Sequence, residues 1–262
     1  MSSSWRFSDL EFVVIWESMR DGTVPPPFVY TSRTPIYQDY LREKAEARES
    51  LRSRLGQAFG SALVAMARPE IRIVVRGWDS RDPANPKGRI SLLAVRRGNE
   101  GYLITQEAGE TVWHSAGFTV EQCGALELAE VVARALPHSD AGTLDRLALD
   151  SVANPEADLD FRYGRSVAHE LNYDPDRDRL QRFLSATPEA GGRIEVAQVG
   201  SRFGPRGVFR RALDWRDLAG DGRYAITEGC PRMAVGVDAK RLTSLINVEI
   251  AEVVRAIKDE RR

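Results

Sequence analysis

The segment ELAEVVARAL, residues 127–136, returns near the end of the chain as EIAEVVRAIK, residues 249–258. In both copies the apolar residues recur every three to four positions, which is the spacing of an amphipathic helix. Two isolated matches would be two ordinary helices. If the neighbouring segments also repeat in the same order, the chain is an internal duplication, and its function should follow from how the two halves differ.

The neighbouring segments do repeat, at nearly constant spacing. The matching pairs are SALVAMAR (61–68) with RLQRFLSA (179–186), IRIVVRGW (71–78) with RIEVAQVGSRF (193–203), RISLLAVRR (89–97) with GVFRRALDW (207–215), and GYLITQEAG (101–109) with GRYAITEG (222–229). One such unit is too small to bury both faces of its sheet. We therefore predict an α+β fold: a single globular domain, 1–262, made of two pseudo-symmetric α-β-meander-α repeats, about 5–136 and about 143–258, that share a central antiparallel sheet.

Local signals place the elements within each repeat. Ser8 and Glu11 form a capping box that starts a first helix, and Asp238 caps the last one. Thr119 and Gln122 resemble a second capping box, which predicts that the repeated helix starts there. A long helical pattern covers 37–67, with a break expected near its two glycines. Period-two alternation predicts strands at 71–78, 89–97, 100–107 and 110–117 in the first half.

Composition excludes several classes of protein. The chain has 42% hydrophobic and 29% charged residues, typical of a soluble globular protein. Lys and Arg number 37 against 38 Asp and Glu, so no overall positive field would gather nucleic acid. Cys123 and Cys230 are the two cysteines, widely separated, and we expect both to be buried and neither to bind metal. No signal peptide or membrane span is predicted, so we expect a cytoplasmic protein without cofactors.

The residues that could carry catalysis are few. Of the three histidines, His114, His138 and His169, none has a metal-binding spacing. Ser166 and His169 could meet on one helical turn, but no orienting acid or oxyanion donors accompany them. The enzyme alternative is a small-molecule site in the cleft between the two repeats, using Ser166, His169 or Asp174. We predict that the protein is not an enzyme.

The stretch GSRFGPRG, residues 200–207, suggests a phosphate loop but has the wrong glycine spacing and precedes a strand, so it is more simply a turn. Arginines surround it, and a nucleic-acid binder using this arginine-rich strand is a third hypothesis. The balanced net charge argues against it. Aromatic residues in the second half that point outward would form an interaction surface.

Five blocks along nearly the whole chain are similar to the EspG family of actinobacterial type VII secretion-associated proteins: WRFSDLEFVVIWE (5–17), VPPPF (24–28), RPEIRIVVRGW (68–78), GSRFG (200–204) and LDWRDLAGDGRYAI (213–226). The resemblance implies a pseudo-two-fold α+β protein whose central antiparallel sheet is flanked by helical bundles. It also implies a cytosolic chaperone without catalytic activity, which binds the hydrophobic tip of the PPE subunit of a PE–PPE heterodimer and keeps it soluble for export.

On this hypothesis the second repeat supplies the contact surface. The predicted apolar contacts are Phe203, Phe209, Trp215 and Tyr224, and the predicted rim contacts are Arg202, Arg210 and Arg211. A chaperone must expose apolar area that its own twin could cover, so a homodimer of the free protein is a further expectation.

Overall fold

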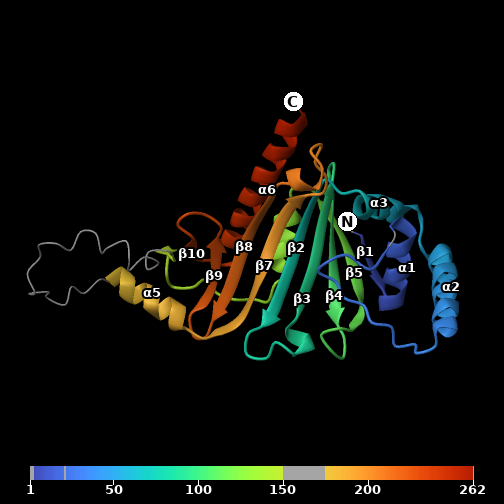
Figure 1. The fold of residues 1–262 in the computed structure, drawn as a ribbon, viewed down its shortest axis with the longest axis horizontal. Coiled ribbons are helices and arrows are strands. Elements are labelled where there is room, and N and C mark those ends of the chain that lie inside the picture. The colour runs from blue at the N-terminus through green and yellow to red at the C-terminus, as the bar shows by residue number, and fades with distance from the viewer. Residues whose placement is uncertain (1–2, 21, 150–174, 262) are drawn as a thin grey trace, which may run out of the picture.

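One large antiparallel sheet runs through the molecule in the computed structural model, which describes residues 3–20, 22–149 and 175–261 (Figure 1). Its described strands follow the spatial order β1-β5-β4-β3-β2-β7-β8-β9-β10-β6. They are β1 Ser4–Phe7, β2 Ile71–Asp79, β3 Ile90–Arg97, β4 Glu100–Ala108, β5 Ser115–Gly124, β6 Leu147–Ala148, β7 Pro188–Gln198, β8 Arg210–Leu218, β9 Gly222–Thr227 and β10 Met233–Gly236.

The centre of the sheet joins the two halves of the chain. Strand β2 pairs with β7 along its whole length, from Ile71 opposite Gln198 to Asp79 opposite Ala190. On one side of this pair β3, β4 and β5 form a meander, and on the other side β8, β9 and β10 do the same. The short strands β1 and β6 cover the two outer edges, which limits unwanted edge-to-edge pairing.

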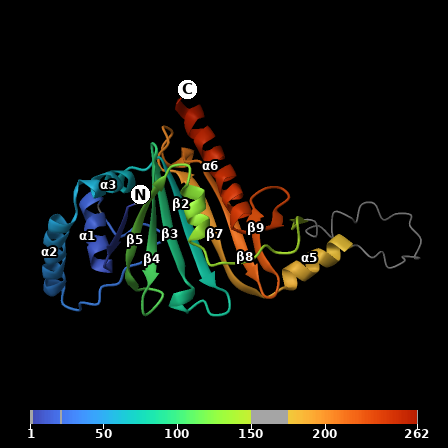
Figure 2. The same ribbon diagram turned by 180° about the vertical axis from the view of Figure 1, so that it is seen from behind.

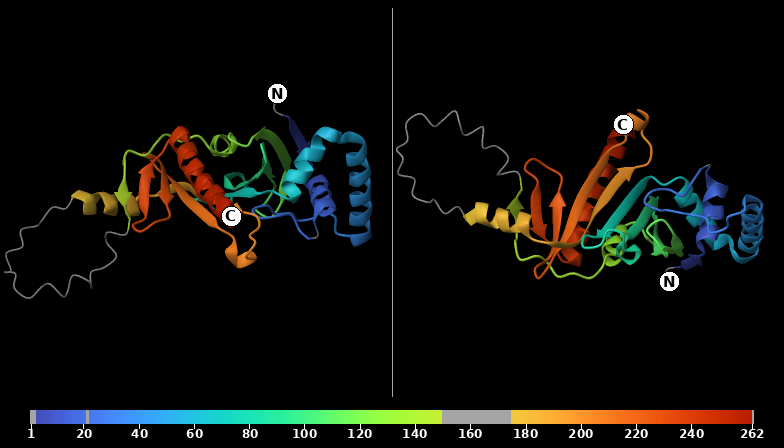
Figure 3. Two further views of the ribbon diagram at one scale, coloured as in Figure 1. Left: turned by 90° about the horizontal axis from the view of Figure 1, so that it is seen from above. Right: turned by 60° about the horizontal axis from the view of Figure 1, so that its bottom comes forward.

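Helices cover the two faces of the sheet unequally. The described helices are α1 Asp9–Met19, α2 Tyr37–Arg54, α3 Gln57–Ala67, α4 Leu128–Arg134, α5 Pro175–Ser185 and α6 Ala239–Arg261, with short 3-10 turns at Pro86–Gly88 and Pro205–Gly207. Helices α4 and α6 lie together on one face, as the view from behind shows (Figure 2). On the opposite face, α1 to α3 cover one end of the sheet and α5 lies at the other (Figure 3).

The two copies of the repeated segment meet in space. The first copy is in α4 and the second is in the C-terminal half of α6, and both contribute buried side chains to one core with β2 and β7. Val131 and Val253, which occupy the same place in the two copies, are both buried there, with 4% and 0% of their surface exposed. The repeated apolar stripe is therefore the surface with which each half covers the shared sheet.

Most local predictions are confirmed. The Ser8 side chain accepts from the Glu11 backbone N–H and the Glu11 carboxylate accepts from the Ser8 N–H, a complete capping box. Asp238 accepts from the Arg241 N–H at 2.7 Å at the start of α6. The long helical pattern divides at Gly56, which is the N-cap of α3.

The prediction for residues 110–122 is wrong. A turn, with a hydrogen bond of 3.1 Å from the His114 N–H to the Thr111 carbonyl, replaces the first half of the expected strand. Strand β5 then runs to Gly124, so Thr119 and Gln122 are strand residues and do not cap a helix. Pairing with β1 on one side and β4 on the other satisfies the β5 backbone, which outweighs the local helix signal.

Candidate functional site

The side of β2, β7 and β8 that is turned away from α4 and α6 is called the central face here. Successive side chains of a strand point to opposite faces. Ile73 and Val75 of β2 join the core under α4 and α6, whereas Val74 joins the core on the other side. Arg72, Arg76 and Trp78 share the side of Val74 and so lie on the central face. Figure 1 looks onto this face, and none of the described helices lies in front of it.

A notch lies at the lower end of the central face in the orientation of Figure 1. Gly191 of β7 stands opposite Trp78 of β2 on one side and Arg216 of β8 on the other. Because glycine has no side chain, a hollow of about 500 Å³ opens here, and Leu184 of α5 contributes to its lining. Trp78 is 46% exposed and Leu184 is 54% exposed. The notch therefore offers apolar walls to an incoming side chain, together with a polar side formed by Ser80, Asp214 and Arg216.

The loop between β7 and β8 carries one of the predicted aromatic contacts. Phe203 is 70% exposed at its tip, and the guanidinium of Arg202 lies 5.7 Å from the ring centroid. The last turn of α6 holds this loop in place. The Glu260 carboxylate accepts from Gln198 Nε2 at 2.8 Å and from Ser201 Oγ at 3.0 Å. These hydrogen bonds lower the pKa of Glu260.

Two more of the predicted contacts are accessible. Phe209 is 37% exposed beside the start of β8. Arg210 is exposed, and in the register of β7 and β8 it stands opposite Ala197, on the central face. Phe209 and Arg210 therefore stay available to a partner, together with Phe203 and Arg202.

The prediction that Trp215 contacts a partner is wrong, because its side chain is 1% exposed. A Cβ at Gly77 would lie 2.9 Å from the Trp215 ring, and one at Gly192 would lie 2.6 Å from its Nε1. The two glycines belong to β2 and β7, and the indole fills the space that they leave on the side of the sheet that α4 and α6 cover. Trp215 is a core residue beneath α4 and α6.

Tyr224 is also buried, so its predicted contact role is wrong as well. Phe183 of α5 packs edge-on against its ring at 5.1 Å between centroids. Its hydroxyl accepts from the Leu144 N–H at 3.1 Å and donates to Asp221 Oδ2 at 2.5 Å. Burial in this environment raises the pKa of Tyr224.

Arg211 does not belong to the rim of the central face. Its Nε donates to Oε2 of Glu249, a residue of α6 that is 4% exposed, at 2.7 Å. The side chain therefore fastens α6 to β8 on the opposite face. Sequence reasoning did not include Trp78 and Leu184, which line the notch on the central face, among the candidate contacts. The alternation in β2 groups Trp78 with Arg76, but no local signal says that this face lacks a covering helix.

The structure describes none of the three residues named for the enzyme alternative. Ser166, His169 and Asp174 lie outside the residues that the structure describes. His138 lines a hollow of about 860 Å³ between the end of α4 and the start of α6, which belong to different halves of the chain. In the described part of the chain, no group of three or more His, Cys, Asp and Glu side chains could hold a metal ion.

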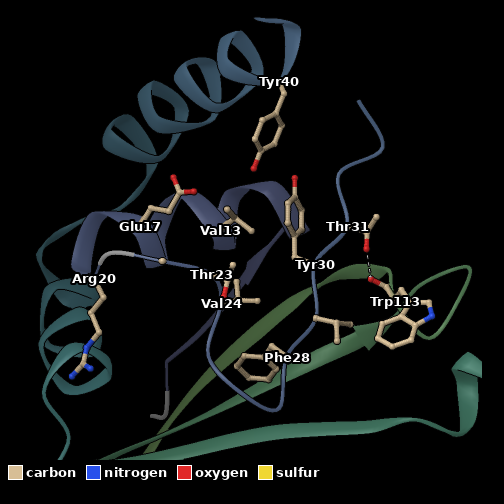
Figure 4. Close-up of a pocket in the computed structure, with 12 residues that line it drawn as sticks. Val13, Glu17, Arg20, Thr23, Val24, Phe28, Tyr30, Thr31, Tyr40 and Trp113 are labelled. Carbon is tan, nitrogen blue, oxygen red and sulfur yellow. Dashed lines mark hydrogen bonds between the residues drawn. The ribbon is translucent and has the colours of Figure 1, made fainter. Parts of the chain in front are cut away.

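A further hollow, of about 680 Å³, lies within the first half of the chain between α1, α2 and the segment after α1 (Figure 4). The hydroxyl groups of Tyr30 and Tyr40 point toward one another across it. Burial raises the pKa of Tyr30, and its hydrogen bond to Tyr40 acts in the same direction. Glu17, on the wall formed by α1, is paired with Lys44 of α2. No residue of the described strands β2, β7 or β8 lines this hollow, so it is separate from the central face.

The two cysteines differ in environment. Cys123 is buried, and burial raises the pKa of its thiol to about 11. Cys230 is exposed, which corrects the expectation that both are buried. Among the helices of the described residues, none is both long and apolar enough to cross a membrane.

Comparisons with known proteins agree on one family and one fold. A model of the EspG family matches residues 8–247. Among solved structures, the chain is similar to the type VII secretion system chaperone EspG5 of Mycobacterium tuberculosis, solved in complex with the PE25–PPE41 dimer. Sequence identity is 11% and the TM-score is 0.57, over 97% of this chain and 96% of the EspG5 chain. No curated protein matches.

Proposed function

This chain belongs to the EspG family, and we propose that it is a cytoplasmic specificity chaperone of a type VII secretion system. In this proposal it binds the hydrophobic tip of the PPE subunit of a PE–PPE heterodimer and keeps that subunit soluble until export. EspG5, which has a similar fold, was solved with a PE25–PPE41 dimer. The chemistry required is protein recognition, and the proposal assigns no catalytic group and no cofactor.

The observation that carries the proposal is the central face with its notch, over which no helix of residues 3–20, 22–149 and 175–261 lies. An antiparallel sheet can leave one face in water, and that face then normally carries polar side chains. Large apolar side chains that are exposed in a concave part of such a face therefore mark an interaction surface. Trp78 and Leu184 are both exposed and border the same hollow. A large aromatic anchor beside a pocket is the arrangement typical of binding hot spots.

We further propose that duplication produced this open face. In the first half, helices α1 to α3 pack against β3, β4 and β5 on the side of the central face. In the second half, α5 packs on Tyr224 of β9 and on Leu218 at the end of β8. The strands between these two helical groups then have no helix of the described chain over them. Divergence between the halves would thus leave a binding surface where a strictly symmetric protein would be covered.

The test is co-expression with each PE–PPE pair encoded in the same genome, followed by size-exclusion chromatography with light scattering. We expect a stable 1:1:1 complex with one pair. The double variant Trp78→Ala with Leu184→Ser should lose it while remaining folded. Val248→Ser is the matched control, because Val248 is 56% exposed on α6, on the other face.

Other outcomes would point elsewhere. A complex that survives the double variant would move the site to the Phe203 loop or to another surface. Soluble, folded protein that binds no pair would contradict the chaperone proposal and favour the alternative, a ligand site in the hollow between α4 and α6. The same light-scattering measurement on the free protein tests whether its exposed apolar residues lead to a homodimer.

A further inference from the structure

The central face carries an excess of arginines in ordered rows. The strand register sets Trp78, Gly191 and Arg216 in one row. The next row across the same strands is Arg76, Arg193 and Asp214. Over β2, β7 and β8, the charged residues on this face are Arg72, Arg76, Arg193, Arg210 and Arg216, against Glu195 and Asp214.

Part of this positive charge is neutralised within the protein. Arg193 Nη1 donates to Asp214 Oδ1 at 2.9 Å, and Arg193 Nη2 pairs with Glu228. Arg232 lies 3.5 Å from the second oxygen of Asp214. Asp214 and Glu228 are therefore already paired with arginines.

The arginines beside the notch lack such partners. In the described part of the chain neither Arg76 nor Arg216 takes part in an ion pair, and both are exposed. Glu195 lies one row beyond Arg76 on the same face and adds one negative charge. Arg89 stands on the other side of Arg76, and its pKa is lowered by burial and by the positive charge of Arg76. The surroundings of the notch are therefore cationic, although the chain as a whole has a formal net charge of −1.

We propose that the partner of the central face presents an acidic tip: carboxylates that pair with Arg76 and Arg216, around an apolar side chain that enters the notch over Gly191. The observation is the juxtaposition of a hollow lined by Trp78 and Leu184 with two arginines that lack an ion pair in the described residues: Arg216 lines the hollow, and Arg76 lies one row away on the same face. Opposite charges across an interface increase the association rate and fix the register of docking. This inference deepens the proposed function by giving the chemistry of the client, but its test does not require the client.

The probes are two short fluorescein-labelled peptides with a central leucine, flanked by glutamates in one and by glutamines in the other. Fluorescence anisotropy measures their binding to the full-length chain. We expect the glutamate peptide to bind more tightly, and raising the salt from about 0.05 M to about 0.5 M to remove most of the difference through screening. The variant Arg76→Gln with Arg216→Gln should weaken glutamate-peptide binding about ten-fold, since two partly exposed ion pairs are lost.

The control is Arg206→Gln with Lys240→Gln, which removes the same charge from exposed positions outside the central face. Equal affinities of the two peptides, or equal losses in the two double variants, would overturn the inference. Tighter binding of a labelled single-stranded DNA than of the glutamate peptide would overturn it in favour of nucleic acid.

The outcome of the co-expression experiment is separate. Selective binding of the acidic peptide without any PE–PPE complex would keep the acidic partner and reject the secretion client. A PE–PPE complex whose affinity is unchanged by Arg76→Gln with Arg216→Gln would keep the client and reject its acidic contact.

Discussion

Substitution of Asp217 by alanine should destabilise the protein strongly, because it leaves a buried cation without its counter-charge. The Arg223 side chain is 4% exposed and that of Asp217 is 12% exposed. Arg223 Nε and Nη2 each donate to one oxygen of Asp217 at 2.7 Å. Nη2 also donates to the Pro137 carbonyl at 2.8 Å, and the guanidinium lies 4.8 Å from the centroid of the Trp215 ring. The pair thus joins β8, β9 and the loop after α4 that contains Pro137.

The size of the effect follows from this burial. Removing one partner of a buried ion pair costs about 3 to 5 kcal/mol, most of which is the penalty of the uncompensated charge. With an m value of about 3 kcal/mol per molar urea, the midpoint of unfolding should fall by roughly 1 to 1.7 M. Asp217→Asn should lose less, because the amide oxygen still accepts one hydrogen bond. Asp217→Leu combined with Arg223→Met should recover much of the loss, because no buried charge remains.

The control is an ion pair at the surface. Arg81 and Glu189 have side chains that are 60% and 43% exposed, so Glu189→Ala should change the free energy of unfolding by less than about 1 kcal/mol. A midpoint for Asp217→Ala within about 0.3 M of the wild type would refute the reasoning, since it would mean that solvent reaches Arg223 in the folded protein.

Two further predictions concern packing and pH. Gly192→Ala should destabilise the protein by about 1 to 3 kcal/mol through overpacking, because its Cβ would lie 2.2 Å from the Arg76 carbonyl oxygen. The control Gly200→Ala, with nothing within 4 Å of its Cβ, should be nearly neutral. Equal urea midpoints for the two variants would contradict this prediction. The hydrogen-bonded guanidinium of Arg33 lowers the pKa of Glu110 from 4.5 to about 2, so the stability from this pair is present above pH 4.5 and is lost as the pH falls toward 2. The melting temperature of Glu110→Gln should therefore fall below that of the wild type at about pH 6 and approach it near pH 2, and a gap that widens on acidification would reverse the sign.

Much of the fold was predictable from local patterns. The repeated segment forms a buried stripe in α4 and α6 because the same apolar spacing produces the same amphipathic helix wherever it occurs. Alternation in β2 places Arg76 and Trp78 on one face, since successive side chains of a strand point to opposite sides. The Ser8 capping box needs only residues three positions apart.

The contact surface depended on residues far apart in the sequence. Trp78 and Trp215 both lie in strands, yet one is 46% exposed and the other 1%. Trp215 is buried because Gly77 and Gly192, on strands brought beside it only by folding, leave space for its ring under α6. Trp78 is exposed because no described helix crosses the centre of the opposite face. Local sequence determined which side chains share a face, and the long-range packing of helices on the sheet decided which face stays open to a partner.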